Sequence, residues 1–190
     1  VVLLIGALLG PVIAPNEVGQ RGMVERVHER LRPPSSAHLF GTDHLGTDVC
    51  SLVLHGARTS IGIGLGAAIL CTVIGVAAGV VAGFFGGGID MVIMRCIDVF
   101  LAFPSLILAI LIAASLGPGM TSIVLALVIT GWPALARIIR GVVIRLKQEE
   151  FIIACRAIGC SRTRIIFHHI LPNCLPLIIV LFTMRVGMMI

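Results

Sequence analysis

Residues 149–172 read EEFIIACRAIGCSRTRIIFHHILP, and they interrupt a strongly apolar chain with a charged, helix-compatible segment. Four apolar residues in it recur at i, i+3, i+4 and i+7, which places them on one helical face: Phe151, Ala154, Cys155 and Ile158. Gly159 suits a turn through positive φ after this helix. Ser161 is placed to cap a second short helix over 162–170 that Pro172 would end. The stretch therefore predicts a helix, a glycine turn and a second helix.

The pattern leaves two interpretations of this hairpin open. In one, the hairpin is amphipathic, lies in the membrane interface and only anchors the flanking spans. In the other, it is a rigid knob that docks into the groove of a cytoplasmic partner.

Composition identifies lipid as the main solvent of the chain. Of 190 residues, 58% are hydrophobic and 12% are charged, whereas soluble domains are about half apolar and about a quarter charged. A net charge of +5 is then expected from loops that face anionic headgroups, and nucleic acid is not an expected partner. The cysteines and histidines show neither Cys-x-x-Cys nor His-Glu-x-x-His spacing, so no disulfide framework, metal site or cofactor is predicted.

Apolar runs predict an all-α, polytopic membrane protein. Residues 1–14 read as the end of a first transmembrane helix, and residues 15–58 as an extracytoplasmic segment ending in a short amphipathic helix near 48–57. Residues 59–190 are expected to form the transmembrane core, because runs in it are long enough to cross about 30 Å of hydrocarbon. The expected spans are 59–84, 90–115, a shorter one over 120–136, and one from 172 onward. Both ends of the chain lie inside apolar runs and look cut.

Glycine recurs at intervals of four residues in the 59–84 span, at Gly62 and Gly66 and again at Gly75, Gly79 and Gly83. Small residues with this spacing let helix backbones approach closely. Glycine is also common in membrane helices without such a role, so both interpretations stay open.

Polar residues in the 90–115 span form a second candidate site. Arg95 and Asp98 are three residues apart and share a helix face, which predicts either an ion pair near the membrane interface or part of a polar path. Pro104 is expected to kink this helix.

Basic residues set the expected orientation. With alternating spans, seven Lys and Arg residues share the side of 137–172 and five share the side of 15–58. The positive-inside rule then places 137–172 in the cytoplasm and 15–58 outside.

The hairpin resembles the "EAA" loop of permease subunits of ATP-binding-cassette (ABC) importers. Ala154 and Cys155 stand at its two alanine positions, Gly159 at its glycine, and Leu171 and Pro172 close it at matching spacing. The chain departs from the pattern where Ile153 stands at the glutamate position and Cys155 replaces the second alanine. Glu150 is the candidate for the acidic role.

Other segments are similar to dipeptide, oligopeptide and nickel importer permeases: HLFGTDHLGTDVCSLVLHGARTS, MRCIDVFLAFPSLILA, LGPGMTSIVLAL, GWPALARIIRG and FHHILPNCLP. Thr47 stands where that family commonly has arginine. The resemblance implies a polytopic helical bundle of the type I ABC importer permease kind, with six spans in the family and both ends truncated here.

The resemblance also implies a function. The chain would form half of a translocation pathway for peptides or a nickel or metal-chelate solute, in a bacterial or archaeal inner membrane. Its implied partners are a second permease subunit in a heterodimer, two cytoplasmic ATPase subunits, an extracytoplasmic solute-binding protein and membrane lipid. The implied ATPase-coupling loop within 137–172 comprises Glu150, Phe151, Ala154, Cys155, Ile158, Gly159, Leu171 and Pro172.

No Gly-x-x-x-x-Gly-Lys-Ser/Thr motif is present in the sequence, so the chain is expected to be a non-catalytic subunit powered by its partners. The alternative is a secondary transporter whose 149–172 hairpin is only an interfacial anchor. Such a protein would carry ionisable residues near mid-span, for which Asp98 and Arg185 are the best candidates.

Overall fold

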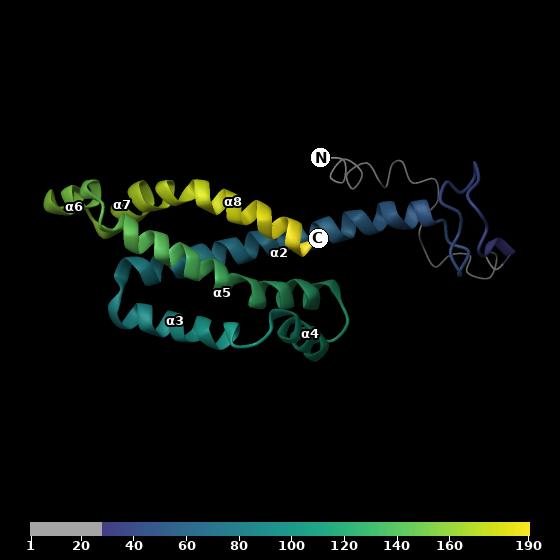
Figure 1. Ribbon diagram of the computed structural model, residues 1–190, viewed down its shortest axis with the longest axis horizontal. Coiled ribbons are helices and arrows are strands. Elements are labelled where there is room, and N and C mark those ends of the chain that lie inside the picture. The colour runs from purple at the N-terminus through teal and green to yellow at the C-terminus, as the bar shows by residue number, and fades with distance from the viewer. Residues whose placement is uncertain (1–27) are drawn as a thin grey trace. The chain divides into compact units, whose positions relative to one another are not determined.

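The computed structural model describes residues 28–190, so the predicted end of a first transmembrane helix at 1–14 lies outside the described residues. The regular elements of the described part are helices, joined by short turns (Figure 1). In chain order they are α2 (Val49–Phe85), α3 (Gly87–Leu101), α4 (Ser105–Leu116), α5 (Met120–Leu146), α6 (Glu150–Ala157), α7 (Arg162–Ile165), the π-helical turn η2 (Ile166–Ile170) and α8 (Leu171–Met189). The chain divides between Gly62 and Ile63 into two compact units.

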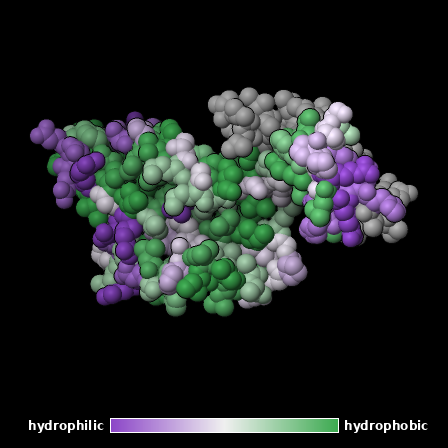
Figure 2. All heavy atoms as spheres, turned by 45° about the vertical axis from the view of Figure 1, so that its right-hand side comes forward, coloured by the Kyte–Doolittle hydropathy of each residue, from purple (hydrophilic) through white to green (hydrophobic). Residues whose placement is uncertain are grey.

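Three helical stretches are long and apolar enough to cross a bilayer: Val49–Phe85, Met120–Leu146 and Arg162–Met189. The pair α3 and α4 passes the same test together but is bent by 87°. Within the second unit, hydrophobic side chains cover much of the bundle, and hydrophilic residues gather at the end that carries α6 and α7 (Figure 2). The prediction of an all-α, polytopic membrane protein is confirmed.

The helix α2 begins before the predicted span start at residue 59, because Asp48 caps it. The Asp48 carboxylate accepts hydrogen bonds from the Ser51 N–H at 2.8 Å and the Ser51 hydroxyl at 2.7 Å. Its other oxygen lies 3.1 Å from Nδ1 of His38. Burial opposes ionisation here, but the Ser51 and His38 contacts outweigh it and hold the pKa of Asp48 below its usual value. A helix near 48–57 is therefore confirmed at its start, but it is not short, because α2 continues through this segment into the span without a break.

The helix boundaries at two prolines differ from the predicted ones, and in opposite directions. At Pro104 the predicted kink is a complete break: α3 ends at Leu101, and Pro104 begins α4 as its N-cap residue. The residue before a proline is disfavoured in helical conformation, which stops the preceding helix. At Pro133, by contrast, α5 runs on to Leu146, so the prediction that this span ends near residue 136 is wrong.

Pro172 does not end a helix either. The helical stretch continues through it from Arg162 to Met189. The turn η2 precedes the proline, and the Leu171 N–H donates to the Ile166 carbonyl five residues back. Wider π-helical turns of this kind are frequent at functional sites. The predicted stop at Pro172 is therefore wrong, and the second arm of the hairpin is continuous with α8.

Close packing of α2 on α5 rests on glycine. A Cβ atom at Gly79 would lie 2.6 Å from the Ala136 carbonyl oxygen and 2.8 Å from the Ile139 Cβ. A Cβ built at Gly75 would lie 2.6 Å from Leu135 Cδ2, and one built at Gly83 would lie 2.8 Å from Val143 Cβ, both on α5. Among residues 28–190, no atom of another element lies within 4 Å of a Cβ built at Gly62 or Gly66. Within the described residues, the close-approach interpretation thus holds for the second glycine series and not for the first.

Candidate functional site

The hairpin of α6 and α7 has the predicted local structure. After α6, Gly159 turns the chain with a φ of 81°, in the left-handed region that favours glycine. The Ser161 hydroxyl then caps α7 by accepting a hydrogen bond from the Arg164 N–H at 3.3 Å. The helix, glycine turn and capped second helix are confirmed. Glu150 is exposed in the first turn of α6, where a carboxylate complements the helix dipole.

The buried residue of α6 is not in the predicted stripe. Ile152 has no exposed surface. In the stripe, Phe151 is 42% exposed and Ile158 is 79% exposed, Ala154 is exposed, and only Cys155 is half-buried. Most of this face is therefore exposed, and of its four residues Cys155 packs against the buried cluster. Sequence reasoning missed Ile152, because a single buried isoleucine leaves no periodic signal within one short helix.

Ile152 fixes the hairpin to the membrane helices. It belongs to one buried cluster with Phe84 of α2, Val143 of α5, Ile165 of α7 and Ile170 of η2. Burying an isoleucine side chain stabilises a fold by about 1.5–3 kcal/mol. The side chains of this cluster come from α2, α5, α6, α7 and η2. Apolar packing therefore attaches α6 to the ends of the candidate spans α2 and α5.

Polar and aromatic contacts add to this attachment. Cys155 Sγ lies 3.5 Å from Nε2 of His169 on η2, and the Phe151 and His169 ring centroids are 6.4 Å apart. Burial raises the pKa of the Cys155 thiol, so little of it is the reactive thiolate. Leu171 packs against the same cluster, whereas Pro172 is exposed at the start of α8. The predicted loop residues are thus brought together, but they face in different directions.

The predicted ion pair between Arg95 and Asp98 is replaced by pairs between helices. Asp98 of α3 pairs with Arg137 of α5. Asp90 of α3 binds Arg140 of α5 through two contacts, Nε to Oδ1 at 2.5 Å and Nη2 to Oδ2 at 2.6 Å. Both carboxylates lie on α3, and α5 packs beside it with arginines three residues apart. A bidentate guanidinium–carboxylate pair across two helices has better geometry than a pair within one helix. Sequence spacing within one segment held no signal for these partners.

Breaking the Asp90–Arg140 pair is expected to loosen α3 from α5. Asp90→Asn or Arg140→Gln should each destabilise the bundle by about 1–3 kcal/mol, because each leaves a partly buried charge without its partner. The double variant Asp90→Arg with Arg140→Asp should recover most of the loss. Thermal denaturation of the purified protein in lipid nanodiscs measures these effects.

The matched control for this prediction is Arg95→Gln, on the same helix. Arg95 is exposed, and the structure records no ion pair for it among residues 28–190. Its replacement should leave the midpoint temperature of thermal denaturation nearly unchanged. An equal loss from Arg95→Gln and Arg140→Gln would show that the bundle responds to total charge, not to the pair.

Arg185, the other ionisable candidate, is half-buried on α8. A Cβ built at Gly131 would lie 3.0 Å from one of its guanidinium nitrogens and 2.6 Å from Cys71 Sγ. Arg185 therefore lies against α5, separate from the Asp90 and Asp98 pairs. Within residues 28–190 no group of three or more His, Cys, Asp or Glu side chains is arranged to hold a metal ion.

Sequence comparisons connect this geometry to known proteins. Residues 75–190 match the family described as "Binding-protein-dependent transport system inner membrane component". The chain is 41% identical over 184 residues to the dipeptide transport system permease protein DppC of Bacillus subtilis, covering 97% of this chain and 56% of that protein. It is 44% identical over 155 residues to the oligopeptide transport system permease protein OppC of the same organism, covering 82% and 51%. It is 43% identical over 162 residues to the glutathione transport system permease protein GsiD of Pectobacterium atrosepticum, covering 85% and 54%. The chain thus spans little more than half the length of these relatives.

Proposed function

The chain belongs to the family of binding-protein-dependent transport system inner membrane components, and from this premise we propose that it forms half of an ATP-driven translocation pathway for peptides. The three relatives above are named for dipeptide, oligopeptide and glutathione transport. All three solutes are peptides, which favours a peptide over a nickel or metal-chelate solute. The secondary-transporter alternative gains no support from these relatives.

The observation that carries the proposal is the outward apolar face of α6. Ile158 and Phe151 are 79% and 42% exposed, yet the helix that bears them is fixed by the fully buried Ile152. A short helix with exposed apolar side chains and a rigid base suits docking into a groove of a partner. Burying the Ile158 side chain in such a groove would contribute about 1.5–3 kcal/mol to the free energy of binding.

The same construction would let the hairpin transmit movement. A force on α6 acts on Ile152 and passes to the cluster residues Phe84, Val143 and Ile165, because closely packed side chains shift together. The second arm, from Arg162, runs into α8 without a break. We infer that the hairpin acts as a lever between a cytoplasmic ATPase and the spans.

Further partners follow from this assignment as proposals. A second permease subunit would complete the pathway, two ATPase subunits would power it, and an extracytoplasmic binding protein would deliver the peptide. This subunit would itself catalyse no reaction. The hairpin side, 137–172, would face the cytoplasm, and 15–58 would lie outside the cell in an inner membrane.

Crosslinking from α6 tests the proposal. Ile158→Cys places a thiol on a predicted docking position that is 79% exposed, whereas the native Cys155 is a poor probe because it is half-buried and its pKa is raised by burial. In the assembled transporter, a thiol-specific crosslinker should join Ile158→Cys to an ATPase subunit well above the background of the native cysteines.

The control is Met120→Cys, which is 60% exposed but lies at the opposite end of α5 from the hairpin. It should capture no ATPase. Capture from both positions, or from neither in a complex shown to contain the ATPase, would contradict docking through α6 and favour the anchoring hairpin.

A further inference from the structure

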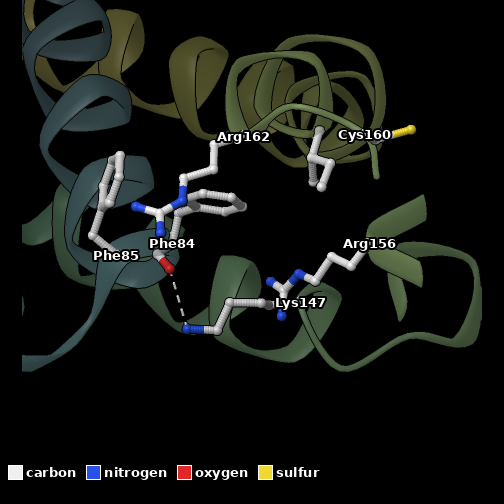
Figure 3. A pocket seen from close by; sticks show the side chains of 7 residues that line it. Phe84, Phe85, Lys147, Arg156, Cys160 and Arg162 are labelled. Atoms are coloured by element: carbon white, nitrogen blue, oxygen red, sulfur yellow. Dashed lines mark hydrogen bonds between the residues drawn. The ribbon is translucent and has the colours of Figure 1, made fainter. Parts of the chain in front are cut away.

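A pocket of about 490 Å³ lies between the hairpin and the end of α2, and the proposed function makes no use of it. Phe84 and Phe85, the last residues of α2, form one side of it. Lys147 at the end of α5, Arg156 of α6 and Arg162 of α7 contribute the polar side chains, which converge on the space beside Phe84 (Figure 3). Three cations from three successive elements thus share one concavity, and none of the described residues that line it is acidic.

Local contacts hold two of these cations, Lys147 and Arg156, in place. The Lys147 ammonium donates to the carbonyls of Gly83 at 3.1 Å and Phe84 at 3.3 Å, at the end of α2. An ammonium has three donors, so one remains for a ligand. The Arg156 guanidinium lies over the Phe84 ring, 5.9 Å from its centroid, in a cation–π arrangement.

No carboxylate of the described chain pairs directly with the three charges, although Lys147 interacts electrostatically with Asp90, whose carboxylate is bound by Arg140. Among residues 28–190 no ion pair joins Lys147, Arg156 or Arg162 to a carboxylate. Like charges around one concavity repel one another, and the repulsion weakens when an anion enters. Guanidinium groups match the geometry of phosphate oxygens better than other cations do.

The position of the pocket at the ends of two candidate spans indicates which anion it could bind. It lies where the candidate spans Val49–Phe85 and Met120–Leu146 both end, and the ends of membrane-spanning helices are expected near the lipid headgroups. Basic pockets between membrane helices at this level are typical headgroup sites.

We propose that this pocket binds the phosphate group of an anionic phospholipid. The headgroup would bridge Arg156, Arg162 and Lys147 and thereby hold the hairpin against the ends of α2 and α5. Inorganic phosphate offers the same chemistry, and the experiment separates the two sources. The proposal that this pocket binds lipid does not depend on the proposed transport function. Any effect of the lipid on transport rests on that function.

The test compares phosphatidylglycerol binding to the complete transporter in phosphatidylcholine nanodiscs that contain a minor fraction of phosphatidylglycerol. Native mass spectrometry reads the fraction of complexes with the lipid retained, without ATP or peptide. The double variant Arg156→Gln with Arg162→Gln should lower the affinity about tenfold or more, since two of the three basic groups that would contact the headgroup are lost. The variant Arg156→Lys with Arg162→Lys should retain most of the binding.

The matched control is Arg145→Gln with Arg164→Gln, which removes two charges from exposed positions next to the pocket that do not line it. It should change the affinity less than about twofold, because only diffuse attraction is lost. Equal losses in both double variants would overturn the site. Displacement of phosphatidylglycerol by millimolar inorganic phosphate would overturn the lipid as the source. Unchanged lipid binding with lost ATPase association would assign the pocket to a carboxylate of the partner and also overturn the proposal.

Discussion

Ile158→Asp is expected to abolish peptide uptake while leaving the permease folded. Ile158 is 79% exposed, so the substitution removes almost no contact within the chain. In the docked state, however, it would forfeit about 1.5–3 kcal/mol of apolar burial and place a carboxylate in an apolar groove. Because about 1.4 kcal/mol is tenfold in affinity, the ATPase should bind a hundredfold more weakly or worse. Copurification of the ATPase and uptake of a radiolabelled dipeptide by proteoliposomes measure the two losses.

The matched control is Ile153→Glu on the same helix. Ile153 is 55% exposed and stands where the resembling loops carry glutamate. It lies on another side of α6 from Ile158, since five residues turn an α-helix by about 140°. Ile153→Glu should keep both ATPase association and uptake. If both acidic substitutions abolish association, the loss reflects charge on the hairpin in general, and the specific docking face is wrong.

Gly79→Leu is expected to disrupt the bundle itself. Even the first side-chain atom at this position would lie 2.6 Å from a backbone oxygen of α5, which no rotamer change can relieve. Overpacking in a close-packed interior costs about 1–3 kcal/mol for small additions, and a leucine adds four carbon atoms between two backbones. The variant should accumulate poorly, and the part that folds should denature at a clearly lower temperature in nanodiscs.

Gly66→Leu is the control on the same helix, because within the part of the chain that the structure describes no neighbouring atom lies within 4 Å of a Cβ built there. Both variants gain about 1 kcal/mol of helix propensity by losing glycine. Gly66→Leu should therefore be neutral or slightly stabilising. A similar loss in both variants would mean that α2 needs glycine for a reason other than its contact with α5.

The sequence alone determined the solvent of the chain, its helical class and the local form of the hairpin. Long uncharged runs are expected to form α-helices in a bilayer, because the backbone N–H and C=O groups find no water there and must form hydrogen bonds within the segment. The turn at Gly159 and the cap at Ser161 depend on only a few neighbouring residues, so their positions were predicted correctly. The spacing from Gly159 to Leu171 and Pro172, together with five further segments in the same order, carried the family resemblance, which the match over residues 75–190 supports.

Tertiary structure decided which side chains are buried, which charges pair and where helices end. Ile152 is buried because Val143 and Ile165 lie across from it, and nothing in the periodicity of α6 favours it over Phe151. Asp98 found its partner 39 residues away on α5, not three residues away at Arg95.

Proline shows the same division. Pro133 lies inside α5, where it is fully buried against neighbouring helices, whereas Pro104 breaks a span between two exposed segments. A proline weakens a helix by a local amount, about 3 kcal/mol, but packing around it decides whether the helix continues. The pocket of Lys147, Arg156 and Arg162 arises in the same way, because only folding the hairpin onto the end of α2 brings three separate elements to one place.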